Sequence, residues 1–217
     1  MEGIDKNKLP KHIAITMDGN GRWAKSKGKL RIFGHKNGVK AVRDTVEGAA
    51  EIGIEYLTLY AFSSENWNRP EREVNALMTL LVSAINKETK TLMDNNIRLS
   101  TIGDINKLPS KAQKELQEAI IKTKDNTRMT LVLALSYSGR GEIINAVQNI
   151  IKDGKKPEEI NEDTFQQYLT TKSVPDPELL IRTSGEYRIS NFLLWQIAYS
   201  ELYFTDTLWP DFRRADL

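Results

Sequence analysis

The stretch HIAITMDGNGRW, residues 12–23, decides how the chain folds. Its first half is a mostly apolar run of strand length, and its second half is a glycine-rich turn that leads into a segment able to start a helix. Such a strand is typical of a parallel sheet that helices cover on both faces. The stretch therefore predicts one strand–turn–helix unit of an α/β protein.

The same alternation of strands and helices continues along the chain. Helical spacing predicts amphipathic helices around residues 39–49, 74–85, 110–120 and 143–151. Ser110 followed by Gln113 reads as a capping box, and Gly154 is expected to end the last of these helices. We predict a single α/β domain over residues 1–217, with a central, mostly parallel six-stranded sheet flanked by helices. The expected strands, most of them central, are 12–17, 56–62, 97–102, 129–135, 179–182 and 202–204.

Composition excludes several classes of function. The 31 Lys and Arg against 29 Asp and Glu leave a net charge of only +2, which argues against a general nucleic-acid binder. Zero Cys excludes a disulfide, a thiolate zinc site and a Cys nucleophile, and two His are too few for a His-rich metal centre. No apolar run reaches the ~20 residues of a membrane span, and the first dozen residues lack a signal core. A soluble protein in the reducing cytoplasm is expected.

The turn after the first predicted strand resembles a phosphate cradle. Glycines let backbone N–H groups approach an anion, and Arg22 adds charge-assisted hydrogen bonds. Asp18 beside such a cradle makes electrostatic sense if Mg²⁺ lies between the carboxylate and a substrate phosphate. A turn in which Asp18 and Asn20 bond their own backbone would give the same pattern. The motif is non-Walker, and it also differs from the dinucleotide fingerprint.

Further cationic and polar side chains follow. Arg31 and His35 lie just before the expected helix at 39–49 and could face the same anion, although an isolated His is more often structural. Residues 61–70, AFSSENWNRP, combine hydroxyls, a carboxylate, an amide and a guanidinium, but they also suit a helix entry with Pro70 at its first position. Trp67 and Trp23 could be core residues or could line an apolar ligand.

Residues 182–192, RTSGEYRISNF, predict a second anion site because two Arg flank a turn rich in Gly and Ser. Glu201 is the remaining acidic candidate, and by itself it would be a surface charge. The segments at Asp18, Ser63 and Arg182 each follow a predicted parallel strand, so they should meet at one edge of the sheet. The arginines expected there suit two polyanionic groups and a metal ion.

Five blocks of sequence resemble the cis-prenyltransferase family, which includes the bacterial undecaprenyl diphosphate synthases. They are MDGNGRWAKSKG, RIFGHKNG, LYAFSSENWNRP, IRTSGEYRISNFLLWQIAYSELYF and WPDF. The resemblance implies sequential condensation of isopentenyl diphosphate onto an allylic diphosphate such as farnesyl diphosphate, with cis double bonds. The product would be a polyprenyl diphosphate such as undecaprenyl diphosphate, a cell-wall lipid carrier. It further implies Mg²⁺, a homodimer, no nucleic acid and peripheral membrane contact through the lipid product.

The resemblance also implies roles for individual residues. Asp18 would be the essential metal-binding carboxylate, Glu201 a second metal ligand near the dimer contact or from the partner subunit, and Asn66 a catalytic residue that helps to remove the proton. Gly19, Asn20, Gly21, Arg22, Arg31 and His35 would hold the allylic diphosphate. Trp23, Ser63, Ser64, Glu65, Trp67 and Arg69 would line and complete the site, and Arg182, Arg188, Ile189 and Ser190 would bind isopentenyl diphosphate.

The growing chain would need an apolar tunnel beside the sheet. The helix that carries Leu77, Met78, Leu81 and Ile85 is its expected wall, and the strand at 129–135 its floor; the alternative is that many of these residues simply fill a core. The chain departs from the family at 136–140, SYSGR, where Asn-Tyr-Gly-Gly-Arg is usual. The resemblance implies a further helix and a basic tail after Leu217, so that part is expected to be short or missing.

Two other functions fit parts of the sequence. A non-catalytic partner subunit of a prenyltransferase complex would lack the blocks quoted above, whereas Asp18, Asn66 and Arg182 are present. A nucleotide-binding phosphotransferase would need a Walker-type Lys and a ribose-binding acid, and neither can be placed in this sequence.

Overall fold

The protein is described by a computed structural model that covers residues 5 and 8–217. Its six strands form one sheet in the order β3-β4-β2-β1-β5-β6, and every neighbouring pair is parallel. The strands are β1 His12–Thr16, β2 Tyr56–Ser63, β3 Ile97–Ile102, β4 Met129–Tyr137, β5 Leu179–Arg182 and β6 Glu201–Phe204. The predicted α/β class and sheet are confirmed.

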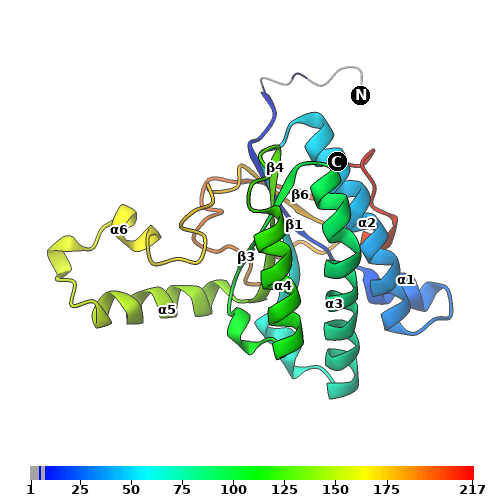
Figure 1. Ribbon diagram of the computed structural model, residues 1–217, viewed down its shortest axis with the longest axis horizontal. Coiled ribbons are helices and arrows are strands. Elements are labelled where there is room, and N and C mark those ends of the chain that lie inside the picture. Colours follow the sequence, from blue (N-terminus) through cyan, green and yellow to red (C-terminus); the bar gives the residue numbers. More distant parts are fainter. Residues whose placement is uncertain (1–4, 6–7) are drawn as a thin grey trace.

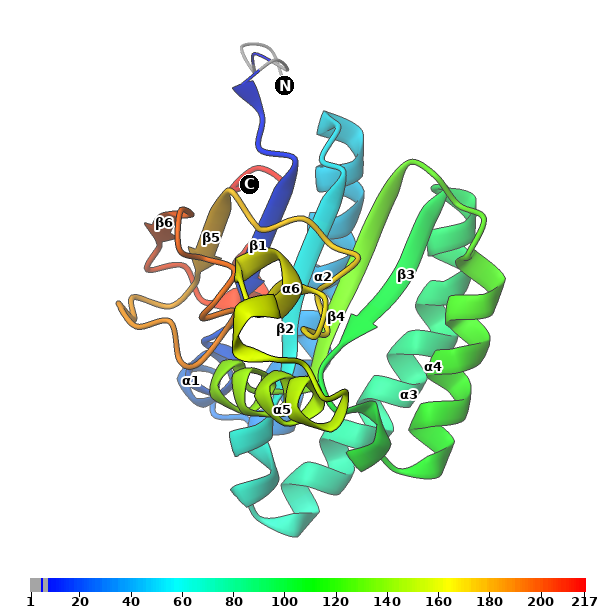
Figure 2. The same cartoon turned by 90° about the vertical axis from the view of Figure 1, so that its left-hand side faces the viewer.

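Helices cover both faces of this sheet. One face carries α2 Arg31–Ile52, α3 Glu71–Asp94 and α4 Ser110–Thr123, with the short α1 Asn20–Ser26 packed on α2 (Figure 1). The other face carries α5 Gly139–Lys152, α6 Glu162–Gln166 and the segment after β5 (Figure 2). Because both faces are covered, the strands between them are apolar on both sides.

Alternating side chains of the strands supply two cores. In β1, Ile13 and Ile15 join the larger cluster under α2, α3 and α4, whereas Ala14 joins a second cluster with Phe192 and Leu193 on the opposite face. All three β1 side chains are buried. This two-sided burial explains why the opening stretch carries the strongest fold signal in the sequence.

The direction of the crossovers reverses next to β1. The chain passes from β1 through α1 and α2 to β2 on one side, and from β4 through α5 and α6 to β5 on the other. In open α/β sheets, ligands bind outside the carboxyl ends of the strands at such a switch point. The segments after β1, β2 and β5 therefore surround the crevice that the topology favours.

The prediction that most of the strands are central is confirmed. β4, β2, β1 and β5 are central, and β3 and β6 form the two edges. In β6, which begins at Glu201, Leu202 and Tyr203 are each about half exposed, so its apolar residues do not report burial within this chain. A short apolar run in the sequence does not show whether its side chains are buried within the chain or against a partner chain.

The prediction of a capping box at Ser110 is wrong, although the predicted helix is present as α4. Pro109 occupies the N-cap position, and the Gln113 amide nitrogen donates to the carbonyl oxygens of Asn106 and Leu108 instead. The last predicted helix, α5, does end near Gly154, as expected.

The helix predicted at 39–49 begins two turns earlier, at Arg31, so Arg31 and His35 lie inside α2 and not before it. Its first turns lack an apolar face because they pack on α1: a Cβ on Gly34 would lie 1.9 Å from the Asn20 carbonyl oxygen. Small and polar residues at this contact hide the helical period from a hydrophobicity pattern. Asn20 likewise starts α1 rather than standing in the turn.

Candidate active site at the carboxyl edge of the sheet

Asp18 follows β1 and is held from two directions. Its backbone N–H donates to Thr183 Oγ1 at 2.9 Å, and its carbonyl accepts from the same hydroxyl at 2.7 Å and from the Trp209 N–H at 2.9 Å. Gly19 comes next with φ of 105°, a left-handed conformation that glycine adopts without strain. The backbone of Asp18 is thus fixed by β5 and by the C-terminal segment, and its carboxylate is left to face the crevice.

The Asp18 carboxylate is ionised. Burial acts to raise its pKa, but the Gly19 N–H, which donates to Oδ1 at 2.7 Å, and the Arg182 guanidinium, 2.9 Å from Oδ2, outweigh burial and hold the pKa below its usual value. The side chain is 36% exposed, so a ligand can still reach it.

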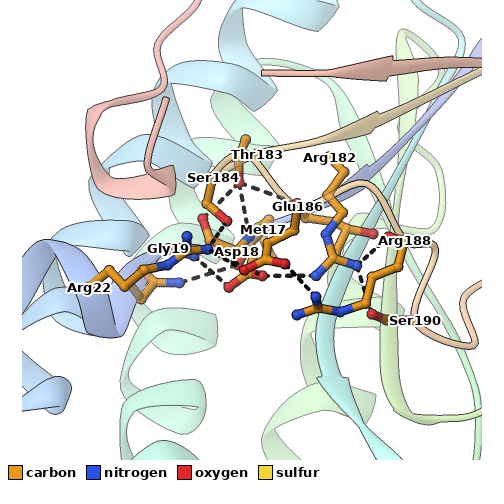
Figure 3. A network of polar contacts seen from close by, with 12 residues as sticks. Met17, Asp18, Gly19, Arg22, Arg182, Thr183, Ser184, Glu186, Arg188 and Ser190 are labelled. Carbon is orange, nitrogen blue, oxygen red and sulfur yellow. Dashed lines mark hydrogen bonds and ion pairs between the residues drawn. The ribbon is translucent and has the colours of Figure 1, made fainter. Parts of the chain in front are cut away.

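Arg182 ends β5 and is the most deeply buried cation of the site, at 3% exposure (Figure 3). Its guanidinium donates to Asp18, to Ser190 Oγ at 2.7 Å and to the Arg188 carbonyl oxygen. Because β1 and β5 are paired with Thr16 opposite Arg182, the Arg182 side chain reaches Asp18, which lies two residues after the end of β1. The parallel register therefore brings Asp18 and Arg182 together, as predicted.

Two more exposed arginines flank this pair (Figure 3). Arg22 of α1 donates to Ser184 Oγ and lies 3.4 Å from a Glu186 carboxylate oxygen, and Arg188 pairs with the same Glu186. Glu186 thus lies between Arg22, which is predicted to bind the allylic diphosphate, and Arg188, which is predicted to bind isopentenyl diphosphate. Glu186 was not singled out from the sequence, although it lies inside the quoted 182–192 run.

A second cationic group lies at the start of α2. Arg31 and Arg69 both lie near Glu73 of α3, at 3.6 and 3.0 Å. His35 lines the adjacent cavity, and its Nε2 is buried with no hydrogen-bond partner in the described part of the chain. Burial, with help from Arg69 and Arg31, lowers the pKa of His35 to about 4, so the ring is neutral near pH 7. An unpartnered neutral imidazole among cations is suited to an incoming anion.

The loop after β2 is a 3₁₀ helix, Ser64–Asn68, that enters α3 through Pro70. Asn66 lines the cavity with His35 and Arg69, and its Oδ1 accepts from the Ser63 N–H at 3.1 Å. Pro70, predicted at the first helical position, is instead the N-cap of α3, and the first helical residue is Glu71. The Asn66 side chain both accepts a backbone hydrogen bond within the loop and lines the cavity.

Asn191 is a residue that sequence reasoning missed. Its Nδ2 donates to Glu65 Oε1 at 2.7 Å and to Ser138 Oγ at 2.8 Å, and its Oδ1 accepts from the Arg140 N–H at 2.8 Å. It thereby joins the segments after β2, β4 and β5. Its φ of 63° is left-handed, a conformation that Asn tolerates better than most residues. The sequence does carry a signal for Asn191: it is a polar residue directly after Ser190, in the segment predicted to bind an anion.

Ser136 and Ser138, the two residues of the 136–140 segment that depart from the family pattern, both make contacts at this site. Ser138 also caps α5 through the Gly141 N–H, and Ser136 accepts from the Trp67 indole nitrogen at 2.9 Å. Trp67 is thereby fixed against Phe62. Trp23, in contrast, is buried and stacked on Phe33, so its main contacts are those of a core residue.

An apolar cavity of about 250 Å³ opens from the polar site between α2, α3 and the sheet. Its polar end includes Asn20, His35, Asn66 and Arg69. The residues predicted as wall and floor do line it: Leu77, Met78, Leu81 and Ile85 from α3, and Leu131, Leu133 and Leu135 from β4.

Glu201 is the predicted site residue that the fold does not bring to this place. It pairs with Leu179 at the amino end of β5, three residues before the level of Arg182, or roughly 10 Å along the strand. Within the described residues there is no group of three His, Asp or Glu side chains that could cage a metal ion. One accessible carboxylate, that of Asp18, suits an ion such as Mg²⁺ that takes most of its ligands from substrate oxygens and water.

The fold and the site together define a class: an all-parallel α/β protein with an arginine-rich crevice at its switch point, next to an apolar cavity. Comparison with known proteins gives the particular family. The chain belongs to the prenyltransferase family described as "Putative undecaprenyl diphosphate synthase", whose model matches residues 16–217. The predicted cis-prenyltransferase family is thereby confirmed.

Relatives and solved structures agree. The chain is 54% identical over 220 residues to a farnesyl-diphosphate-specific ditrans,polycis-undecaprenyl-diphosphate synthase of Pasteurella multocida, covering 100% of this chain and 92% of that protein. It is 55% identical to an isoprenyl transferase of Chlorobaculum tepidum, covering 96% and 80%. A crystal structure of lavandulyl diphosphate synthase from Lavandula x intermedia, in complex with dimethylallyl diphosphate, matches with a TM-score of 0.92 and 38% identity, covering 95% and 91%.

Among the helices of residues 8–217, none is both long and apolar enough to cross a membrane.

Proposed function

We propose that this chain is a single catalytic domain that adds isopentenyl diphosphate units to an allylic diphosphate, with farnesyl diphosphate as the starter, and makes a polyprenyl diphosphate with cis double bonds. The observation that carries the proposal is the geometry of the arginines beside one apolar cavity. Arg22 and Arg31 lie near the starts of α1 and α2, which meet at Gly21, whereas Arg182 and Arg188 lie at the end of β5 and on the loop after it. These two cationic groups and the cavity match two diphosphates and one hydrocarbon chain. The names of two relatives support an allylic diphosphate substrate: one is specific for farnesyl diphosphate, and the other was solved with dimethylallyl diphosphate.

The cationic side chains have the main role in the proposed reaction. As the allylic C–O bond breaks, negative charge grows on the leaving diphosphate, and preorganised donors stabilise that charge. We assign this role to Arg22, Arg31 and the neutral His35, whose buried Nε2 is ready to hydrogen-bond an oxygen. Gly19, Asn20 and Gly21 let the backbone of α1 approach the same group.

The isopentenyl diphosphate is assigned to the other half of the site, with Arg182, Arg188, Ile189 and Ser190. Its double bond attacks the allylic carbon, and the new cation then loses a proton. Asn66 is a neutral amide and therefore a poor base, so we assign it hydrogen bonding near the departing proton rather than proton uptake. Ser63, Ser64, Glu65 and Trp67 shape this end of the cavity.

Asp18 would hold Mg²⁺, with Glu201 of a second subunit as a further ligand. When bound, the ion would neutralise part of the diphosphate charge. Without the ion, Asp18 neutralises Arg182, so the carboxylate is already placed where cationic and anionic groups meet.

The apolar cavity would serve as the tunnel for the growing chain, since most of its lining is hydrocarbon; away from the polar end, its charged lining residues are Arg43 and Glu88, which pair with each other. A dry cavity also keeps water away from the cationic carbon.

A homodimer would cover apolar surface that this chain leaves open. The edge strand β6 exposes Leu202 and Tyr203, the neighbouring Tyr199 is fully exposed, and α5 exposes Ile144 and Ile151. A partner subunit that packs on either surface would bury these side chains.

The absence of Cys suits a reducing, cytoplasmic setting.

The direct test is incubation of the protein with farnesyl diphosphate, labelled isopentenyl diphosphate and Mg²⁺, followed by chromatography of the products. We expect labelled polyprenyl diphosphates that disappear when a chelator is added. A folded protein that makes no product would indicate a non-catalytic partner subunit, and tight ATP binding in calorimetry would indicate a phosphotransferase.

Arg188→Ala tests the assignment of the two anion sites. Because Arg188 lies on the loop assigned to isopentenyl diphosphate, we expect the KM for that substrate to rise by about 10-fold or more, with a smaller change for the allylic substrate. A change confined to the allylic substrate would reverse the assignment.

A further inference from the structure

The cations of this chain are concentrated in one segment. Residues 19–43 contain eight Lys and Arg and no Asp or Glu, so the remaining 23 cationic residues face all 29 acidic ones. The net charge of +2 therefore conceals a strongly basic segment on an otherwise acidic protein. Charge asymmetry of this kind indicates an interaction with an anionic surface.

This segment is α1, the turn that follows it and the first turns of α2, and it lies at the edge of the molecule (Figure 1). We call it the basic turn. Leu30, at the N-cap of α2, is 80% exposed, and Phe33 is 38% exposed. Phe33, Lys36 and Lys40 follow at spacings of three and four, which places them along one face of α2. Leu30 and Phe33 thus place two exposed apolar side chains one turn apart among the lysines, which is the mixed apolar and basic surface of an interfacial segment.

The lysines of the basic turn are not neutralised by the protein. Its three arginines have carboxylate neighbours: Arg22 has Glu186, Arg31 has Glu73 and Arg43 has Glu88. Lys27 packs over the Trp23 ring. Within residues 8–217, no carboxylate lies within 4 Å of the remaining lysines, which are Lys25, Lys29, Lys36 and Lys40.

We propose that the basic turn docks on the surface of a bilayer that contains anionic phospholipids. The unpaired lysines would meet the lipid phosphates, and Leu30 with Phe33 would enter the boundary between headgroups and acyl chains. A nucleic acid would use the lysines but not an exposed leucine at the tip, so the pairing of charge with apolar surface favours the lipid.

The position of the turn gives this docking a purpose, and that part rests on the proposed function. Arg31 and His35 belong to the same helix, so the site assigned to the allylic diphosphate lies next to the docking surface. An enzyme that makes a lipid diphosphate would then face the membrane that receives its product. The docking itself requires no turnover, so the two proposals can fail separately.

The test measures co-sedimentation of the full chain with vesicles of zwitterionic phosphatidylcholine, with and without added phosphatidylglycerol. One variant combines Lys29→Glu, Leu30→Ser and Lys36→Glu. Its matched control makes the same changes at exposed residues of α4, Lys114→Glu, Ile121→Ser and Lys122→Glu. None of the six residues is assigned to the site, so both variants should keep their melting temperature and their prenyl transfer in detergent.

We expect the wild-type protein and the α4 control to bind only the anionic vesicles, less tightly as salt is added. The basic-turn variant should lose at least about 100-fold in apparent partition coefficient, since each lysine near such a surface contributes about fivefold. Equal loss in both variants, equal binding to neutral vesicles, no vesicle binding at all, or a preference for duplex DNA would overturn the proposal. Vesicle binding by an inactive protein would refute only the proposed function, and activity without vesicle binding only the docking.

Discussion

At the scale of single residues, Asp18 and Arg182 depend on each other. Arg182 is almost completely buried, and Asp18 is the carboxylate that compensates its charge. Removing one member of a buried ion pair leaves the other charge unpaired, which costs stability as well as function. A simple alanine variant of Asp18 would therefore mix the two effects.

Asp18→Asn reduces this mixing. The amide oxygen can still accept from the Gly19 N–H and from Arg182, although Arg182 loses its counter-charge, so we expect a loss of about 100-fold or more in kcat with a smaller fall in Tm than in Asp18→Ala. Asp18→Ala should lose the same activity and in addition about 1–2 kcal/mol of stability, a modest figure because the carboxylate is partly exposed. Steady-state kinetics and thermal melts of both variants check this, and full activity in the Asn variant would refute the assignment.

Asn191 offers a second prediction at this scale. Asn191→Gly keeps the left-handed backbone and removes the side chain that joins Glu65, Ser138 and Arg140. Because the neighbouring Ser190 and Arg188 would lose their anchor, we expect the KM for isopentenyl diphosphate to rise by about 10-fold with a smaller change in Tm.

The control for Asn191 is Ser138→Gly, which removes only one of its hydrogen bonds and the cap of α5. It should have a weaker effect on the same KM. If Asn191→Gly lowers Tm strongly and leaves both KM values unchanged, the residue has a structural role alone.

At the scale of elements, α3 forms one wall of the cavity, and its own faces provide a matched pair of variants. Ala84 lines the cavity, whereas the adjacent Ser83 is exposed. Ala84→Phe should shift the products to shorter chains because the added ring occupies space needed by the hydrocarbon. Ser83→Phe should leave the product distribution unchanged. Chromatography of the products decides, and identical distributions would mean that the chain grows elsewhere.

The elements also show where prediction from sequence succeeded. The strands were found because β1, β2 and β4 are buried on both faces and therefore read as continuous apolar runs. The start of α2 was missed because its first turns pack on α1 through Gly34 and Gly38, where small residues replace the apolar period. α6 was missed as well, since its five residues are too short for a helical period to show.

At the scale of the whole molecule, two histidines make the stability depend on acid pH: His12, which is buried at the start of β1, and His35, which is partly buried in α2. His12 accepts from Thr58 Oγ1 at 2.7 Å and donates to the Pro175 carbonyl at 2.6 Å, so it fits its surroundings as a neutral ring. Burial lowers its pKa to about 4, as it does for His35.

The unfolded chain, with histidine pKa near 6.5, binds more protons than the folded one between pH 6.5 and 4. Stability should therefore fall as the pH falls through this window, by up to about 3 kcal/mol for each histidine. Denaturant unfolding as a function of pH measures the slope. His35→Gln should reduce that slope, and an unchanged slope in both His35→Gln and His12→Gln would assign the acid sensitivity to carboxylates.

The sequence by itself determined the fold class and the family, because apolar periods and ordered motifs are local properties of the chain, and it predicted that the segments after three strands converge at one edge of the sheet. Only the tertiary structure decided which side chains of those segments touch. The parallel register joins Asp18 to Arg182 and places Glu201 at the opposite end of the sheet, and the loop packing gives Asn191 and Glu186 their partners. Contacts between residues more than a hundred positions apart depend on strand order and direction, and a pattern of neighbouring residues cannot encode them.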